Sequence, residues 1–314
     1  MGKIIVTGAS GAFGRAAAEM LLDRCAAEDL ILLSRTPARL QDLAERGAEV
    51  RIADFDDRPT LAAAMAGGER MLLISTARVG TRVEQHRAAV DAAVAQGVGH
   101  IVYTSVIAAD RPDNPAIVKN DHRATERIIE ASGAAWTHLR DSQYAEAIAV
   151  AMAVPALLAG RKPDNCGDGR VGFVSRDDCV ATAVGVLTQD GHANRAYTLT
   201  GPELLSIPEA MALVTELSGR PITVEPVSDE AMFAYFDSLG VPRHASDVVP
   251  DGPIPWSSED MVTFGRSIRE GYFEELTDCV ERIAGHRPRP LRDVMSAHMG
   301  AWPQGERADG CRNL

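Results

Sequence analysis

The chain has 314 residues, of which 46% are hydrophobic and 24% are charged, a composition typical of a globular enzyme with a large buried core. Its net charge of -12 argues against nucleic acid or an anionic membrane as a partner, because both require a basic surface. The chain opens without a basic and apolar leader, contains no membrane-spanning apolar run, and has five cysteines without a C-x-x-C pair. We therefore expect a soluble, cytoplasmic protein.

The first predicted elements are a strand and a helix separated by a glycine-rich turn. Residues 3–6 are mostly apolar and strand-forming, and residues 15–22 are strongly helical. Glycines spaced three apart allow a backbone to approach a pyrophosphate and a helix to pack closely on a strand. The helix N-terminus then faces the phosphates. We predict that the turn binds a dinucleotide through Gly8, Ser10, Gly11, Ala12, Phe13 and Gly14.

The second predicted strand, residues 30–35, indicates which dinucleotide is bound. An acidic residue after this strand binds a ribose 2′-hydroxyl, whereas an arginine can hold a 2′-phosphate. The chain has Arg35 there, Arg39 one turn later, and no carboxylate in residues 34–40. This pattern favours NADP(H) over NAD(H), unless Arg35 is only a solvated surface residue. Thr36 and Pro37 are expected to begin the next helix.

Three further strands are predicted at residues 49–54, 70–75 and 100–105. Asp54 and Phe55 follow the first of them, where an adenine would lie, although Asp54 could instead cap the next helix. The ends of the other two strands are expected to border the cofactor. The predicted cofactor contacts from these strand ends are Asp54, Phe55, Ser75, Thr76, Tyr103, Thr104 and Ser105.

Helices at residues 82–96 and 118–132 and a sixth strand at residues 135–140 continue the alternation. Alternating strands and helices predict an α/β fold, a Rossmann-type doubly wound parallel sheet, with a smaller, mostly helical C-terminal substrate lobe. We place the NAD(P)-binding domain at residues 1–150 and the substrate lobe at residues 151–314. Strands near 171–175 and 196–200 are expected to return to the main sheet.

The C-terminal half is expected to begin with an alanine-rich helix over residues 143–158. Ser175 and Ser206 each precede an acidic residue by three positions, which predicts capping boxes at two helix starts. Residues 241–255 are expected to form a proline-rich loop, and residues 303–314 to fray.

This order of signals resembles the NmrA-like atypical short-chain dehydrogenases and, within that family, the bacterial NAD(P)H:quinone oxidoreductases. The residues that carry the resemblance lie in both halves of the predicted fold. They are residues 6–14, 34–37, 103–105, 122–126, 139–140, 173–178 and 197–202. The resemblance implies an NAD(P)H-dependent oxidoreductase with a planar aromatic or quinonoid small-molecule substrate.

The chain departs from the usual short-chain dehydrogenase pattern at the catalytic helix. Typical members carry Tyr-x-x-x-Lys, and no such spacing occurs in this sequence. Aligning Glu126 with the glutamate of the family's helix puts Val118 in the tyrosine position and His122 in the lysine position. His122 is therefore the candidate catalytic residue, as a proton donor or a contact to the cofactor ribose, with core packing as the alternative. Tyr144, just past the sixth strand, is a candidate substrate contact, with core packing again the alternative.

Hydride transfer to a quinone remains chemically reasonable without the dyad, because resonance stabilises the developing oxyanion and water can protonate it. We therefore predict reduction of a quinone-like or conjugated aromatic carbonyl. Two alternatives stay open: a tailoring or hydroxylation enzyme acting on aromatic polyketides, and a non-enzymatic redox sensor that binds NAD(P) without turnover. A metal centre is not expected, because the eight histidines and five cysteines show no metal-site spacing.

Overall fold

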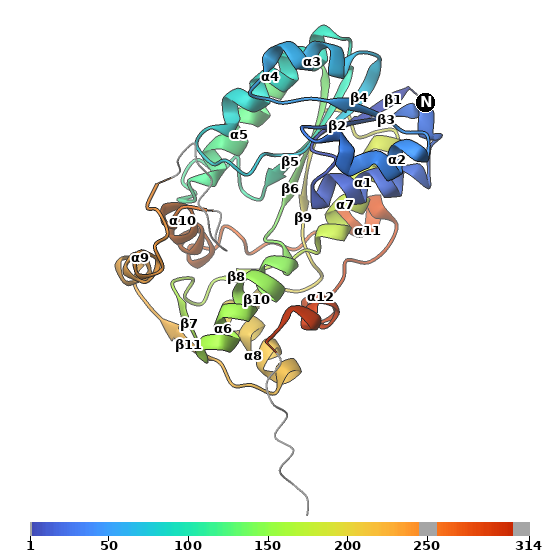
Figure 1. Cartoon of the computed structure of the whole chain (residues 1–314). Coiled ribbons are helices and arrows are strands. Elements are labelled where there is room, and N and C mark those ends of the chain that lie inside the picture. The colour runs from blue at the N-terminus through green and yellow to red at the C-terminus, as the bar shows by residue number, and fades with distance from the viewer. Residues whose placement is uncertain (1, 245–255, 304–314) are drawn as a thin grey trace, which may run out of the picture.

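A computed structural model describes residues 2–244 and 256–303. Its centre is a parallel sheet of seven strands, seen edge-on in Figure 1. In spatial order the strands are β3 (Glu49–Ile52), β2 (Leu30–Ser34), β1 (Lys3–Val6), β4 (Gly68–Leu73), β5 (His100–Val106), β6 (Ala135–Asp141) and β9 (Arg195–Leu199). This order confirms the predicted doubly wound α/β fold.

The central strands are apolar along most of their length because helices cover both faces of the sheet. Val6 of β1 is paired with Leu32 of β2 and Leu72 of β4, and all three are completely buried. The carboxyl ends of all the strands lie at one edge, so the loops that follow them meet there. This edge is where the fold positions a ligand.

A layer of helices covers each face of the sheet. The layer on one face consists of α1 (Ala12–Leu22), α2 (Gln41–Glu45), α7 (Arg176–Thr188) and α11 (Cys279–Ala284). The layer on the other face consists of α3 (Arg58–Met65), α4 (Arg82–Ala95) and α5 (Val118–Glu130). Short 3-10 turns, η1 (Ala27–Asp29) and η2 (Pro37–Leu40), flank β2.

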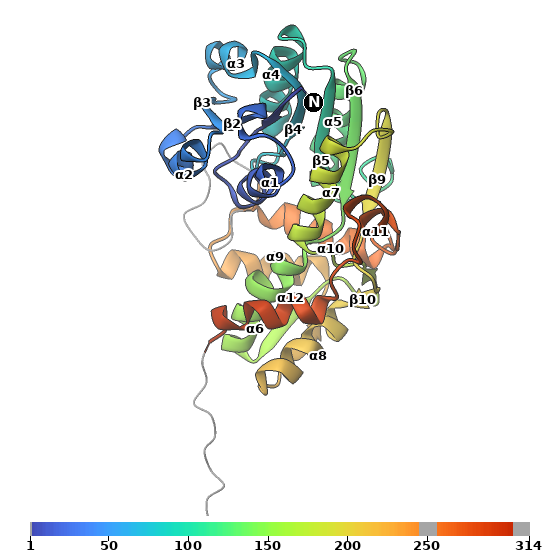
Figure 2. The ribbon, with the colours of Figure 1, turned by 90° about the vertical axis from the view of Figure 1, so that its right-hand side faces the viewer.

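Below the sheet in Figures 1 and 2 lies a mostly helical C-terminal lobe with its own apolar core. Its helices are η3 (Ala147–Met152), α6 (Ala153–Ala159), α8 (Ile207–Ser218), α9 (Asp229–Ser238), α10 (Ser258–Arg269), α12 (Leu291–His298) and η4 (Met299–Ala301). Its small sheets pair β7 (Arg161–Asp164) with β11 (Thr223–Pro226), and β8 (Arg170–Val171) with β10 (Leu205–Ser206).

The expected return of two late strands to the main sheet is half right. β9 pairs with β6, as predicted for residues 196–200. The strand expected near 171–175 does not join the sheet, because β8 pairs antiparallel with β10 and Val174 forms only an isolated bridge to Tyr144 beyond β6. β9 fills the edge of β6 that this segment would have needed. A division of the chain at residue 150 remains a prediction.

The helix starts differ in detail from their predictions. Ser206 and Glu209 form the predicted capping box of α8. Ser175 caps α7 by accepting from the Asp177 amide, but no capping box forms there, because the Asp178 carboxylate accepts the backbone N–H of Arg289 instead. Thr36 makes no side-chain cap, and its own N–H donates to Ser34 Oγ.

The single helix predicted over residues 143–158 is divided into a π-helical segment, η3, and the regular helix α6. The change of pitch lies directly before Pro155, which has no N–H to donate to the preceding turn. Most of the predicted 241–255 loop and the predicted frayed end at 303–314 lie outside the described residues. Within the described part of the chain, no helix is both long and apolar enough to cross a membrane.

Candidate functional site

The glycine turn lies between β1 and α1, and within it the Gly11 N–H donates to the Gly8 carbonyl oxygen at 2.9 Å. Gly8 has a φ of +59°, a conformation that glycine adopts at low cost, and both Gly8 and Gly11 are exposed. A Cβ on Gly14 would lie 2.4 Å from the Gly8 carbonyl oxygen, so only glycine permits this close packing of helix on turn. The first turn of α1 contains no acidic residue. The turn therefore has the shape that the predicted pyrophosphate contact requires, and the contact itself stays a prediction.

The other predicted residues of the turn are divided between the surface and the core. Ala12 is exposed at the start of α1, whereas Phe13 is buried in the core beneath the turn. Ser10 Oγ accepts a 2.8 Å hydrogen bond from Ser34 Oγ at the end of β2. This bond fixes the glycine turn against the loop that carries Arg35.

Arg35 and Arg39 are both exposed, and neither guanidinium forms a hydrogen bond or ion pair with another described residue. Arg15 of α1 lies beside them, donating to the Arg39 carbonyl oxygen at 3.1 Å. The two free cations lie beyond β2, where a ribose 2′-phosphate is held in dinucleotide-binding folds. Arg35 and Arg39 thus have the charge and the exposure that the predicted cofactor contacts require.

Asp54 and Phe55 follow β3 and are half-buried. Asp54 Oδ1 accepts from the Asp56 amide, while Thr60 Oγ1 accepts the Asp54 N–H, so the loop is folded on itself. Asp54 does not cap α3, whose N-cap is Asp57, so the helix-cap alternative is wrong. Phe55 packs against the core under α3 and α4. Their contact with an adenine stays a prediction.

The ends of β4 and β5 are joined by hydrogen bonds. The Ser75 N–H donates to Thr104 Oγ1 at 2.9 Å, and the Thr76 N–H donates to His86 Nε2 at 3.1 Å. The Thr76 hydroxyl donates to Gln85. Ser75 and Thr76 are half-buried at the sheet edge, whereas Thr104 is buried behind them. Thr104 therefore positions the loop after β4, and its burial leaves it little surface for contact with a ligand.

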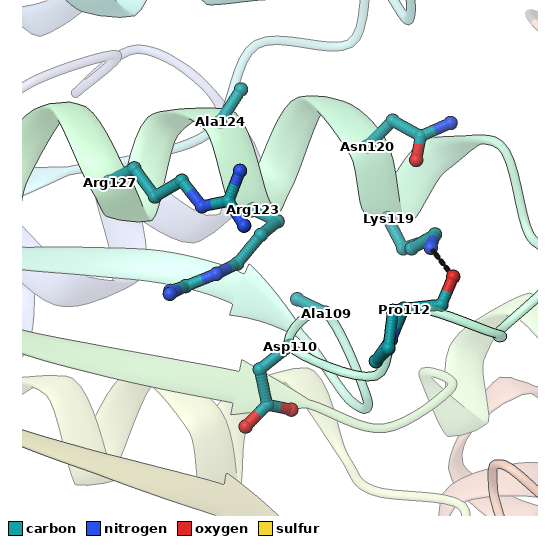
Figure 3. A pocket seen from close by; sticks show the side chains of 8 residues that line it. All are labelled: Ala109, Asp110, Pro112, Lys119, Asn120, Arg123, Ala124 and Arg127. Carbon is teal, nitrogen blue, oxygen red and sulfur yellow. Dashed lines mark hydrogen bonds between the residues drawn. The ribbon is translucent and has the colours of Figure 1, made fainter.

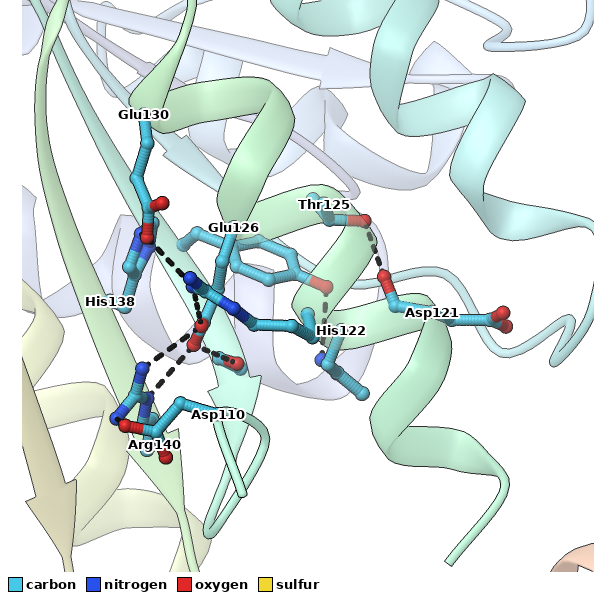
Figure 4. Close-up of polar contacts among 11 residues, drawn as sticks. Asp110, Asp121, His122, Thr125, Glu126, Glu130, His138 and Arg140 are labelled. Carbon is cyan, nitrogen blue, oxygen red and sulfur yellow. Dashed lines mark hydrogen bonds and ion pairs between the residues drawn. The ribbon is translucent and has the colours of Figure 1, made fainter. Parts of the chain in front are cut away.

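His122 lies in a buried polar network between β5, α4 and α5 (Figure 4). Arg82 donates to its Nε2 at 3.1 Å, and because a guanidinium can only donate, the ring proton is on Nδ1. Nδ1 then donates to Tyr103 Oη at 2.9 Å. Burial and the charge of Arg82 lower the pKa of His122 well below its usual value.

This environment argues against the proton-donor role predicted for His122, because the ring is neutral and both nitrogens are paired within the protein. Tyr103 is completely buried, which leaves it no surface for the predicted cofactor contact. Burial raises its pKa. Asp121 completes the network, pairing with Arg82 at 3.4 Å and accepting the Gly80 N–H at 2.6 Å. The network holds the loop after β4 against α5.

Glu126 is the centre of a second buried network, also drawn in Figure 4. Its carboxylate is completely buried and accepts from Arg140 at 2.9 and 3.0 Å, from Arg123 at 2.9 Å and from Ser105 at 2.8 Å. Although burial opposes ionisation, the hydrogen bonds from Arg140 lower the pKa of Glu126. Ser105 is thereby committed to the core rather than to the predicted cofactor contact.

One group of three residues among those described, Glu126, Glu130 and His138, brings its ligand atoms close enough for a metal ion. Arg123 NH1 already lies between the two carboxylates, 2.9 Å from Glu126 and 2.8 Å from Glu130. The positive charge of this group is therefore supplied by arginine, and the group needs no metal.

The segment that follows β6 contrasts with both networks. Three consecutive buried side chains, those of Asp141, Ser142 and Gln143, each have a polar atom without a hydrogen-bond partner among the described residues. Tyr144 Oη is 2.6 Å from Asp141 Oδ2. Burial raises the pKa of Asp141 to about 7. Unpaired buried polar atoms are costly, and these three lie in consecutive residues at the edge of the sheet where parallel folds bind ligands. Such atoms also occur elsewhere among the described residues, for example in Arg82, Asp164 and Asp260.

A pocket of about 290 Å³ lies elsewhere, on the outer face of α5 (Figure 3). Its lining includes Lys119, Arg123 and Arg127, three cations at successive turns of the helix. Lys119 donates to the Pro112 carbonyl oxygen and Arg123 to Glu126, so two of the three are engaged within the protein. This pocket faces away from His122, which lies on the inner side of α5.

The glycine turn, the parallel sheet and the open strand edge define an NAD(P)H-binding protein. A family model described as NAD(P)H-binding matches residues 8–190, more than half of the chain, and the chain belongs to that family. Quinone oxidoreductase 2 of Escherichia coli is 35% identical over 93% of this chain and 97% of the relative. An NmrA-like oxidoreductase of Aspergillus flavus is 27% identical over 93% and 94% of the two chains.

Solved structures give the same result. The Escherichia coli quinone oxidoreductase in complex with NADPH has a TM-score of 0.85, with 31% identity over 94% of this chain and 99% of that chain. The Citrobacter triphenylmethane reductase in complex with NADP(H) has a TM-score of 0.83, with 28% identity over 94% and 100%. The predicted resemblance to NmrA-like oxidoreductases is confirmed, and the chain is an NAD(P)H-dependent oxidoreductase.

Sequence reasoning did not single out Asp141, Ser142 and Gln143. Three polar residues directly after a buried strand were the available signal, since strand carboxyl ends meet ligands in parallel sheets. Arg82 and Asp121 were also missed, because only the fold brings the start of α4 beside α5.

Proposed function

We propose that this protein uses NADPH to reduce a quinone-like or conjugated aromatic carbonyl compound. The observation that carries the proposal is the exposed glycine turn, whose amides and close helix packing suit a pyrophosphate. The names of the two structural neighbours, a quinone oxidoreductase and a triphenylmethane dye reductase, support a planar conjugated substrate. The five cysteines without C-x-x-C spacing support a cytoplasmic location.

The residues that hold the cofactor follow from the geometry of the strand ends. Gly8, Gly11 and Ala12 bind the pyrophosphate, and Arg35 with Arg39 binds the 2′-phosphate. The reduced dinucleotide, when bound, supplies a hydride. Charge-assisted hydrogen bonds from the two free guanidinium groups favour NADPH over NADH.

Reduction of a quinone suits a site without Tyr-x-x-x-Lys. The oxyanion that forms on a quinone is stabilised by resonance, so its protonation demands a less specialised acid than that of a simple alkoxide. His122, in the lysine position, is neutral and paired with Arg82 and Tyr103. Its role in this proposal is to hold α5 and the loop after β4 in place.

The test is NADPH oxidation, followed by absorbance, with a panel of benzoquinones, naphthoquinones and a triphenylmethane dye. The expected result is substrate-dependent oxidation that is faster with NADPH than with NADH. Tight NADPH binding without turnover of any substrate would instead favour a redox sensor. Turnover restricted to polycyclic aromatic polyketides would favour the tailoring enzyme.

A further inference from the structure

The side chains after β6 contain the features of a proton donor that the α5 helix lacks. Asp141 is 4% exposed and ends β6, at the edge of the sheet where the glycine turn also lies. Its Oδ2 is 2.6 Å from Tyr144 Oη, and its Oδ1 has no hydrogen-bond partner among the described residues. Tyr144 is half-buried as a whole residue, and burial raises the pKa of its phenol well above the usual value, so the pair forms one desolvated hydrogen-bonded unit.

The surroundings of this pair favour the protonated form of the Asp141 carboxyl group up to about neutral pH. The groups that face Asp141 are the Tyr144 phenol of its own segment and the Cys179 thiol of α7. The Arg176 guanidinium lies over the Tyr144 ring, 5.7 Å from its centroid, and Asp178 and Glu146 lie near Cys179. Among the described residues no arginine or lysine pairs with Asp141, and burial raises its pKa to about 7. Glu126, which is as deeply buried, is ionised because Arg140 and Arg123 pair with it.

We infer that Tyr144 donates a proton to the substrate oxygen in the proposed reduction and that Asp141, acting through Tyr144, resupplies it. This inference rests on the proposed function. Tyr144 packs against the core cluster that includes Ala9 and Phe13 of the glycine turn, so the phenol belongs to the same side of the sheet as the cofactor loop.

The proton balance is simple. Hydride addition leaves one negative charge on a substrate oxygen. In the structure the Tyr144 hydroxyl donates to Asp141 Oδ2 at 2.6 Å, and proton transfer requires this bond to reverse. The Tyr144 O–H bond then breaks as a new O–H bond forms on the substrate oxygen, and the carboxyl proton of Asp141 moves to the Tyr144 oxygen. Asp141 is left as a carboxylate and regains a proton from water. The overall reaction consumes one reduced cofactor and one proton for each quinone reduced to the quinol.

The test compares Tyr144→Phe and Asp141→Asn with the wild type, using NADPH and a naphthoquinone. Tyr144→Phe is expected to lower kcat by about 10²-fold or more, in the range of general acid catalysis, with an unchanged Kd for NADPH. Asp141→Asn keeps the shape of the site but holds no transferable proton. It is expected to remove the fall in kcat as the pH rises through about 7. The matched control is Tyr197→Phe, which removes a phenol hydroxyl of β9 that is hydrogen-bonded to His192.

A second readout does not depend on turnover. Below pH 7 the infrared spectrum of the wild type is expected to contain a protonated carboxylic acid band that the spectrum of Asp141→Asn lacks. Above pH 7 this band should disappear from the wild-type spectrum. Full kcat in Tyr144→Phe, or an unchanged pH profile in Asp141→Asn, would overturn the inference while leaving quinone reduction standing. A wild type that oxidises no NADPH with any quinone would remove the proposed function and this inference together.

Discussion

Two buried polar regions flank the sheet edge, and they differ in how completely their atoms are paired. Around His122, both ring nitrogens, the Tyr103 hydroxyl and one terminal nitrogen of Arg82 have hydrogen-bond partners, and Arg82 Nε, which has none, forms an ion pair with Asp121 at 3.4 Å. After β6, Asp141, Ser142 and Gln143 each retain an unpaired buried atom. A fully paired network fixes structure, whereas unpaired buried atoms are costly unless something else compensates for them. In our proposal the chemistry therefore lies after β6 rather than on α5.

The proposed function requires a cofactor bound at the glycine turn, so the largest effect is expected from a substitution that blocks this turn. Gly11→Val is expected to abolish NADPH binding while the protein remains folded. Gly11 has a φ of -81° and a ψ of 166°, which valine adopts readily, but its β-carbon would point toward the Gly8 carbonyl oxygen at 3.3 Å. Calorimetric titration with NADPH measures the loss, and circular dichroism checks the fold. Near-normal affinity in the folded variant would contradict the assigned site.

The second prediction separates the two regions by the pH dependence of stability. Folding raises the pKa of Asp141 from 3.8 to about 7, so the folded state binds the extra proton between these values. Stability from this group is therefore complete below pH 4 and is lost as the pH rises to about 7. The shift corresponds to roughly 4 kcal/mol.

Asp141→Asn removes this titration. The wild type is expected to lose roughly 4 kcal/mol of its free energy of unfolding between pH 4 and pH 8 through this group, and the variant is not. Urea denaturation at a series of pH values measures the difference. A difference that does not change with pH would mean that Asp141 is ionised in the folded protein, contrary to its unpaired environment.

The third prediction concerns the cofactor rather than the proton. Arg35→Asp is expected to shift preference from NADPH toward NADH, because an aspartate repels a 2′-phosphate and accepts from a 2′-hydroxyl. The loss of charge-assisted bonds corresponds to about 1.5–3 kcal/mol, or roughly one to two orders of magnitude in NADPH affinity. Affinities are measured for both dinucleotides, with Arg24→Asp as a charge-matched control away from the strand end. A wild type that already prefers NADH would contradict the assignment.

The smallest expected effect on turnover belongs to His122→Phe. The neutral ring donates no proton to a substrate, so kcat should change by far less than the 10²–10⁴-fold of a lost general acid. Stability should fall by about 1–3 kcal/mol, because Arg82 and Tyr103 each lose a buried partner. Thermal unfolding and kcat at saturating NADPH measure the two effects. A thousandfold loss of kcat with cofactor binding intact would restore the proton-donor role of His122.

The sequence predicted the sheet and the glycine turn well, because both depend on local patterns. An apolar strand, a glycine at positive φ and a helix start are encoded within residues 3–22. The pairing of β8 with β10 was not predictable, since it depends on which sheet edge remains open after β9 has paired with β6.

The candidate site was less predictable, because burial decides the chemistry of each side chain. Tyr144 was recognised from its place after a strand, but its partner Asp141 acquires a raised pKa only when α7 covers it. His122 lies where the family pattern placed it. Its neutral state follows first from burial and then from the charge of Arg82, which is forty positions away in the chain and is connected to it by no local pattern.

The pH dependence of kcat, compared between one variant from each region, tests the central claim most directly. The measurement uses wild type, His122→Phe and Asp141→Asn with saturating NADPH and one naphthoquinone, from pH 5 to pH 9. The account predicts that the fall in kcat through about pH 7 persists in His122→Phe and is absent in Asp141→Asn. Loss of that step in His122→Phe, with an unchanged profile in Asp141→Asn, would contradict it.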